Sequence, residues 1–177
     1  MKTHFVVTIT CPDRPGIVER VTEVVAEHAA NWEESRLARL GGDFAGIVRV
    51  SVPQEHAAAL SSALRELTNE QMTVTVRTSH SPAAVFSVSG HRLCALRLTG
   101  ADHEGIVHAV STYLASQQIN VEAMDTQVVP APVSAAPLFH MDAQIRIPPG
   151  LSLPELDANL QRIGEELGVD IDVRPIE

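Results

Sequence analysis

The sequence of 177 residues is poor in aromatic and basic side chains. The shortage of basic residues excludes a class of protein, and the shortage of aromatic residues constrains the core. Lys and Arg number 13 against 22 Asp and Glu, so the formal net charge is −9, and no basic run is present. A nucleic-acid surface needs clustered cations that release counterions from phosphates. We therefore expect no direct contact with nucleic acid. Only 3% of the residues are aromatic while 45% are hydrophobic, so aliphatic side chains must fill the core.

Cysteine and long apolar runs are also scarce. Two cysteines, Cys11 and Cys94, are too few for a disulfide framework and suit a reducing compartment. The apolar stretch at residues 5–9 is too short for a signal peptide, and no stretch approaches the roughly 20 residues of a membrane-spanning helix. We therefore expect a cytoplasmic protein without membrane contact.

One motif occurs twice in the chain. Asp13-Arg-Pro-Gly-Ile-Val returns as Asp102-His-Glu-Gly-Ile-Val, at an offset of 102 − 13 = 89 residues. The same offset joins four further pairs of identical residues: Thr10 and Thr99, Val21 and Val110, Asn31 and Asn120, and Glu33 and Glu122. A constant offset over so many positions indicates two copies of one module.

Hydrophobic periodicity predicts the same βαββαβ order of elements in each copy. In the first copy we expect strands at 5–9, 31–40, 44–52 and 72–76, and helices at 17–28 and from Pro53 onward. In the second copy we expect strands at 93–99, 121–129, 140–147 and 170–174, and helices at 104–116 and 154–167. The fold class is therefore α+β, with two tandem ferredoxin-like modules that each contain an antiparallel four-stranded sheet.

The expected domain limits are 1–78 for the first module and 91–177 for the second, with a linker at 79–90. Ser152 and Glu155 form a capping-box pattern at the start of the last helix. The proline-rich segment 130–137 has no counterpart in the first copy, and we interpret it as a stiffened loop that is either structural or a binding arm.

The repeated motif lies where a strand ends and a helix begins. Asp13 is a candidate N-cap, Pro15 suits the first helical turn, and Gly16 allows a close approach of backbone or ligand. Such a helix start presents backbone N–H groups that can receive a carboxylate. Asn31 adds an amide suited to the polar atoms of an amino acid. Ordinary capping and a turn asparagine remain the structural alternative, because a duplicated fold repeats its caps.

These features resemble the ACT domain, and two such domains filling a chain resemble the glycine cleavage system transcriptional repressor family. The resemblance implies binding of a small amino acid, with glycine or serine as first guesses. It also implies action through a LysR-type activator protein. The second copy departs from the motif, with His103 for arginine and Glu104 for proline. The implied ligand-binding residues are Asp13, Arg14, Pro15, Gly16, Ile17, Asn31, Asp102, His103, Gly105, Ile106 and Asn120.

We therefore interpret the chain as a non-enzymatic regulatory protein, expected to form a homodimer and to need neither cofactor nor metal. Two alternatives stay open. One is an interaction module whose ligand site is vestigial, and the other is a small enzyme that uses the thiol of Cys11. The neighbours Glu33 and Glu34 do not suggest paired catalytic carboxylates, because adjacent residues of a strand are expected to point to opposite faces.

Overall fold

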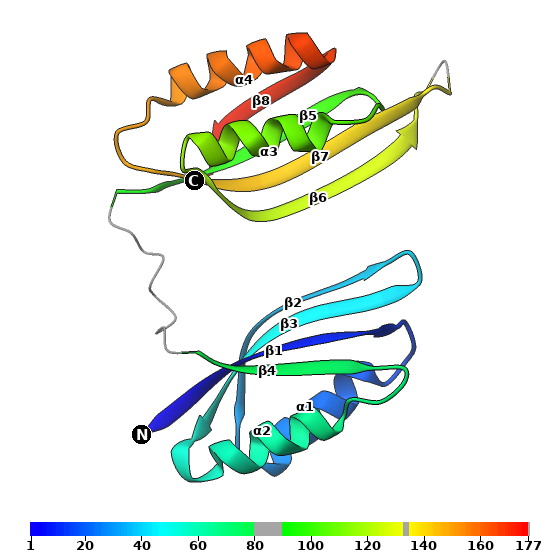
Figure 1. The fold of residues 1–177 in the computed structure, drawn as a ribbon, viewed down its shortest axis with the longest axis vertical. Helices are drawn as coiled ribbons and strands as arrows, with labels where there is room; N and C mark the ends of the chain where they lie inside the picture. Colours follow the sequence, from blue (N-terminus) through cyan, green and yellow to red (C-terminus); the bar gives the residue numbers. More distant parts are fainter. Residues whose placement is uncertain (80–89, 133–134, 177) are drawn as a thin grey trace. The chain divides into compact units, whose positions relative to one another are not determined.

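The computed structural model describes residues 1–79, 90–132 and 135–176. The chain divides into two compact units, Met1–Val85 and Phe86–Glu177, and each unit is described by itself (Figure 1). The expected linker at 79–90 falls almost wholly outside the described residues, so the domain limits stay predictions. Within the described part of the chain, no helix is long and apolar enough to cross a membrane.

The first unit is an antiparallel four-stranded sheet with two helices on one face (Figure 1). The strand order across the sheet is β2-β3-β1-β4. Its elements are β1 (Lys2–Pro12), α1 (Ile17–Glu27), β2 (Asn31–Leu40), β3 (Asp43–Pro53), the short 3-10 helix η1 (Gln54–His56), α2 (Ala57–Glu66) and β4 (Thr73–Ser79).

The second unit repeats this architecture, with the strand order β6-β7-β5-β8. Its elements are β5 (Arg92–Ala101), α3 (Ile106–Ser116), β6 (Asn120–Pro130), β7 (Pro137–Ile147), α4 (Leu153–Leu167) and β8 (Val169–Pro175). The predicted α+β fold of two ferredoxin-like modules is confirmed.

Side-chain alternation along the strands separates a core face from an open face in each unit. On β1, Val7 and Ile9 are almost fully buried beneath the helices, where they meet Val21 of α1 and Leu60 and Leu64 of α2. Burying one such aliphatic side chain contributes about 1.5–3 kcal/mol. The intervening residues of β1 lie on the open face, which no helix covers (Figure 1). This open face is therefore available for polar and charged side chains.

Several element ends differ from the predictions. Pro53 ends β3 instead of opening a helix, and α2 begins only at Ala57, after a 3-10 turn. The helix predicted from residue 104 begins at Ile106, because Gly105 has a left-handed φ of 92° that no helical residue adopts.

The second hairpin is longer than predicted. β7 begins at Pro137 instead of His140, and Pro137 is the register partner of Pro130 at the end of β6. The N–H of Ala131 donates to the carbonyl of Ala136 at 2.8 Å. Prolines are tolerated at strand ends, where no ladder hydrogen bond is needed, so the proline-rich segment extends the hairpin rather than forming only a loop.

Helix α4 packs directly against strand β8 at Gly164. This glycine is buried, and a Cβ built on it lies 2.5 Å from the carbonyl oxygen of Val169 and 3.2 Å from Ile171 Cγ1. Its role is steric, since the absence of a side chain lets the helix lie directly on the strand.

We predict that Gly164→Ala lowers the free energy of unfolding by about 1–3 kcal/mol through overpacking. Helix propensity alone would raise it by about 1 kcal/mol, so the two effects have opposite signs. Ala158→Gly, at an exposed position of the same helix, is the matched control that reports propensity alone. Urea unfolding measures both variants, and a stabilised Gly164→Ala protein would contradict the steric role.

Candidate functional site: two glycine-capped loops and an open sheet face

Each repeated motif contains a left-handed glycine that caps a helix. Gly16 has φ 90° and precedes α1, and Gly105 has φ 92° and precedes α3. At such angles a residue with a Cβ is strained, so the turn requires glycine. Glycine has no side chain, and neither helix start receives a side-chain cap. The predicted N-cap role of Asp13 is therefore wrong, and Pro15 precedes the helix instead of lying in its first turn.

Asp13 contacts the β2–β3 hairpin instead of the helix. Its N–H donates to the carbonyl of Gly42 at 2.9 Å, and its Oδ2 lies 2.7 Å from Nε of Arg39. Asp102 is placed similarly by its N–H, which donates to the carbonyl of Pro137 at 3.1 Å. Asp13 lies too far before the first helical residue to cap it, because the cap falls on Gly16. The two aspartates therefore anchor their loops to the neighbouring hairpins.

The first-turn N–H groups of α1 and α3 are consequently left for an external acceptor. Among the described residues, no side chain accepts from these N–H groups. The side chains of Ile17 and Ile106 are buried in their cores, which fixes the helix ends in place. A helix N-terminus carries about half a positive charge, so it favours a carboxylate.

The second residue of each motif ties its loop to the segment that precedes the last strand. Arg14 Nη1 donates to Oε1 of Gln71 at 2.7 Å. His103 contacts two backbone carbonyls, that of Glu104 at 2.9 Å through Nδ1 and that of Leu167 at 2.7 Å through Nε2. Carbonyl oxygens only accept, so both contacts are made together only by the doubly protonated ring. These carbonyls, first Glu104 and then Leu167, raise the pKa of His103 above its usual 6.5.

The structure does not bring Asn31 to the motif of its own unit. Asn31 pairs with Ser51, which pairs with His4 at the beginning of β1, whereas the motif follows Pro12 at the end of that strand. Eight residues separate His4 from Pro12, or about 26 Å at 3.3 Å per residue. One small ligand cannot contact both Asn31 and the loop after Pro12 within the first unit.

Asn120 occupies the matching place in the second unit and has a structural partner. Its Nδ2 donates to Oε1 of Glu122 at 2.9 Å, and the same oxygen lies 2.8 Å from Nε of Arg146. Arg146 is also the register partner of Asn120. The asparagine repeat is thus part of a polar cluster at one end of the open face.

Sequence reasoning missed the β-bulges that hold Glu33 and Glu122. The pairing of each edge strand with its neighbour shifts at these residues. Glu33 lies 3.1 Å from Arg49 Nε and 3.6 Å from His4 Nε2, although the Arg49 contact is an ion pair by distance and lacks hydrogen-bond geometry. Glu34 is the register partner of Arg49, so both glutamates lie on the open face. The expectation that they point to opposite faces is wrong, because a bulge interrupts alternation.

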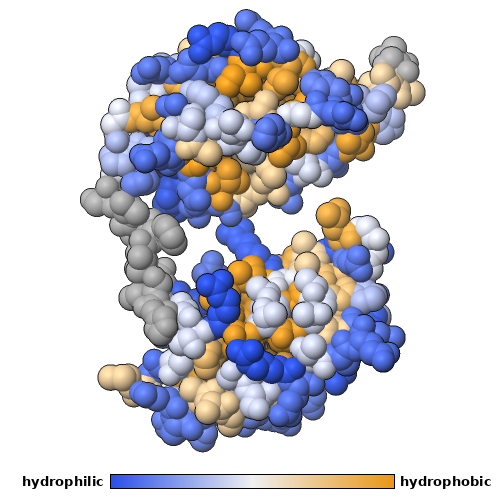
Figure 2. Space-filling view, viewed as in Figure 1, coloured by the Kyte–Doolittle hydropathy of each residue, from blue (hydrophilic) through white to orange (hydrophobic). Residues whose placement is uncertain are grey.

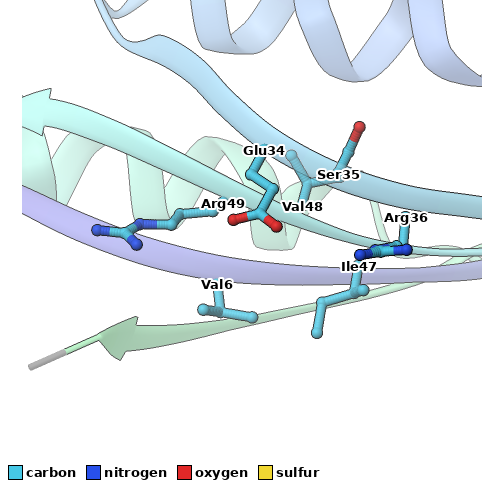
Figure 3. Close-up of a pocket in the computed structure, with 7 residues that line it drawn as sticks. All are labelled: Val6, Glu34, Ser35, Arg36, Ile47, Val48 and Arg49. Atoms are coloured by element: carbon cyan, nitrogen blue, oxygen red, sulfur yellow. The ribbon is translucent and has the colours of Figure 1, made fainter. Parts of the chain in front are cut away.

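The open face of the first sheet has a shallow hollow of about 220 Å³ (Figure 3). Val6 and Ile47 form its apolar floor, and Glu34, Arg36 and Arg49 surround it with charge. In Figure 3 the Glu34 carboxylate lies between the side chains of Arg49 and Arg36.

The two cysteines are poorly placed for thiol chemistry. Cys11 and Cys94 are both buried, and burial raises the pKa of each thiol, which disfavours the nucleophilic thiolate. Within the described part of the chain, no group of three or more His, Cys, Asp or Glu residues is placed to hold a metal.

Comparisons with known proteins agree with this architecture. Residues 3–79 match the model of the ACT domain. The crystal structure of an unknown protein from Galdieria sulphuraria is 34% identical, covers 100% of both chains and superimposes with a TM-score of 0.80. A solved structure described as a candidate glycine cleavage system transcriptional repressor is 21% identical, with a TM-score of 0.72 over 100% of this chain and 99% of the other.

Two curated relatives carry a functional name. The glycine cleavage system transcriptional repressors of Escherichia coli (strain K12) and Shigella flexneri are each 23% identical over 166 residues, which is 93% of this chain and 85% of the relative. Residues 3–79 belong to the ACT domain family, and the second unit repeats the same fold in tandem. It is similar to the glycine cleavage system transcriptional repressors, as the sequence motifs predicted.

We predict that the His103 contacts stabilise the second unit only at low pH. A group whose pKa is raised by folding adds stability that is complete below its unfolded pKa, here about 6.5, and is lost as the pH rises through the folded value. His103→Ala should therefore lower the melting temperature at about pH 6 but change it little at about pH 8.5.

His103→Lys is the control, because lysine stays protonated over this range. Between about pH 6 and about pH 8.5, its melting temperature should change less than that of the parent protein, because lysine does not titrate there. Calorimetry at the two pH values measures all three proteins. An equal effect of His103→Ala at both values would show that protonation of His103 is irrelevant.

Proposed function

We propose that the chain is a non-enzymatic sensor of a small amino acid that regulates transcription through a protein partner. The observation that carries the proposal is the pair of helix starts at Gly16 and Gly105, which are open because the turn demands a residue without a side chain. The names of the curated relatives support glycine cleavage as the regulated process. A LysR-type activator is the proposed partner, and the net charge of −9 agrees with a regulator that does not bind DNA itself.

The proposed ligand is glycine or serine, whose carboxylate accepts from the N–H groups at the start of α1 or α3. Each hydrogen bond to such a charged acceptor contributes about 1.5–3 kcal/mol, so a few of them give a reversible affinity. The proposed contacts come from the loop residues Asp13, Arg14, Pro15, Gly16 and Ile17, and from Asp102, His103, Gly105 and Ile106.

Asn31 cannot contact a ligand that is bound at the loop of its own unit, so it can contribute only to a loop site of another unit. We propose that Asn31 of one copy of the chain completes the loop site of a second copy in a homodimer, and Asn120 is its weaker counterpart because Glu122 already engages it. The edge strand β2 has unpaired backbone groups, and it exposes Leu37 by 38% and Leu40 by 82%. Hydrophobic patches (orange) lie among hydrophilic ones on the visible surface in Figure 2. An uncovered edge with apolar side chains invites pairing.

One observation favours the alternative of a vestigial site. Arg14 and His103 are both engaged by their own units, through Gln71 and through the carbonyls of Glu104 and Leu167. If these tethers are permanent, the loops serve packing and the chain is an interaction module. A ligand screen separates the two functions.

We predict that glycine or serine raises the melting temperature of the full-length protein. Binding to the native state alone adds RT ln(1 + [L]/Kd), or about 2.7 kcal/mol at a hundredfold excess over Kd. Amide NMR shifts should change first at Gly16, Ile17, Gly105 and Ile106. β-Alanine, with a longer spacing between its charges, is the control ligand. A protein that no amino acid stabilises would refute the sensor and leave the interaction module.

We predict that Asn31→Ala weakens glycine binding in the homodimer while leaving the fold intact, because Asn31 is exposed. Gly16→Ala, which forces a Cβ into a left-handed turn, should weaken binding as well. When the two variants are refolded together, roughly a quarter of the first-unit sites should regain both wild-type elements, since half of the dimers are mixed. Calorimetry measures this recovery. Mixing without recovery would show that Asn31 does not act across copies.

A further inference from the structure

The hollow on the open face of the first sheet lies away from the motif loops and is lined by strands alone. Val6 comes from the central strand β1, Ile47 and Arg49 from β3, and Glu34 and Arg36 from the edge strand β2. Ile47 is exposed by 46%, so its side chain adds apolar surface beside Val6. An apolar floor with charged side chains at its rim is the composition of a small-molecule site.

The charges at this rim are not satisfied by one another. Arg49 is half-buried and paired with Glu33, which lies in the bulge. That pairing leaves Glu34, the register partner of Arg49, without a cation. Among the described residues, neither Glu34 nor Arg36 forms an ion pair, although they are two positions apart on one face. Residues so spaced on a strand are about 6.6–6.8 Å apart.

The second unit shows that the fold does not require this set of residues. The register of its sheet gives the equivalent position for each hollow residue, and none of the equivalents is a cation or a large aliphatic side chain. The equivalents of Val6, Ile47, Arg49, Glu34 and Arg36 are Ala95, Asp142, Gln144, Ala123 and Asp125. The same backbone therefore folds without the apolar pair and without the Glu34 and Arg36 charges at these five positions.

We propose that this hollow binds a free aliphatic L-amino acid. The Glu34 carboxylate accepts from the ligand ammonium group, and the Arg36 guanidinium donates to its carboxylate. The aliphatic side chain of the ligand lies on Val6 and Ile47. A zwitterion fits two unpaired and opposite charges on one strand better than an anion or a cation does, since either of these would meet one repulsive partner. This site is separate from the glycine-capped loops, which offer N–H groups and bind by a different chemistry.

L-Leucine titrated into the full-length protein by calorimetry tests the site, with amide NMR to locate it. We expect shift changes at Val6, Glu34, Arg36 and Ile47. Arg36→Gln and Glu34→Gln should each weaken binding about tenfold or more, as expected for the loss of a charge-assisted hydrogen bond. Ile47→Asn should weaken it as well. All three side chains are exposed, so their replacement leaves the core intact.

Two variants on helix α1 and one analogue of leucine serve as controls for the loss of charge. Arg20→Gln and Glu23→Gln change the same charges on the exposed surface of α1, and leucine affinity should stay unchanged. 4-Methylpentanoate, which lacks the ammonium group, should bind at least about tenfold more weakly than leucine.

Three outcomes would overturn the proposal. The first is an absence of leucine binding, and the second is leucine-induced shifts confined to the loops around Gly16 and Gly105. The third is a change of molecular mass in light scattering with Arg36→Gln, which would make this face an interface between copies. A glycine titration that follows the amide NMR shifts of the loops tests the sensor function separately. One proposed site can therefore be disproved while the other is confirmed.

Discussion

The alternation of side chains along the central strands β1 and β5 is the constraint on which the rest of the molecule depends. Each central strand is hydrogen-bonded on both sides, so neither can slip without breaking two ladders. Phe5, Val7 and Ile9 must face the helices, and a shift by one residue would expose all of them. Because the helices cover one face only, every second residue of these strands is free of the core and can serve another purpose.

Comparison of the two repeated units shows which positions the fold requires and which it leaves free to vary. Two sets of positions are alike in both units: the left-handed glycines at 16 and 105, and the bulge glutamates at 33 and 122. The arginine that each glutamate contacts comes from a different register position in each unit. Open-face positions have diverged, since Ile47 corresponds to Asp142. The asparagine at the start of β2 and β6, Asn31 and Asn120, is also the same residue in both units. In the second unit the amide of Asn120 helps to hold the bulge glutamate, Glu122.

Local patterns sufficed to predict the order of elements and the fold, because periodicity and β-branched runs are properties of short segments. They did not place the helix cap, since Asp13 and Gly16 both suit that position by residue type and only the backbone φ separates them. They also did not show that Asn31 lies near His4 and Ser51, which depends on strand order and register. The bulge at Glu33 left only a faint signal, the repeat of a glutamate two residues after a repeated asparagine. The hollow had no signal, because its residues come from three strands.

A sensor needs contacts that differ between its states, because a ligand shifts an equilibrium only by its unequal affinity for them. In this chain the loops beside the open helix starts are held by the contacts of Arg14 with Gln71 and of His103 with Leu167. Both are exposed and individually weak, so a ligand at the loop can compete with them at small energetic cost. Both contacts also end at the segment before the last strand. Their release therefore removes a contact just before β4 or β8 as well as one at the loop. The repeated loop therefore connects the proposed ligand position to the segment before the edge strand that pairs with β1 or β5, through a single side chain.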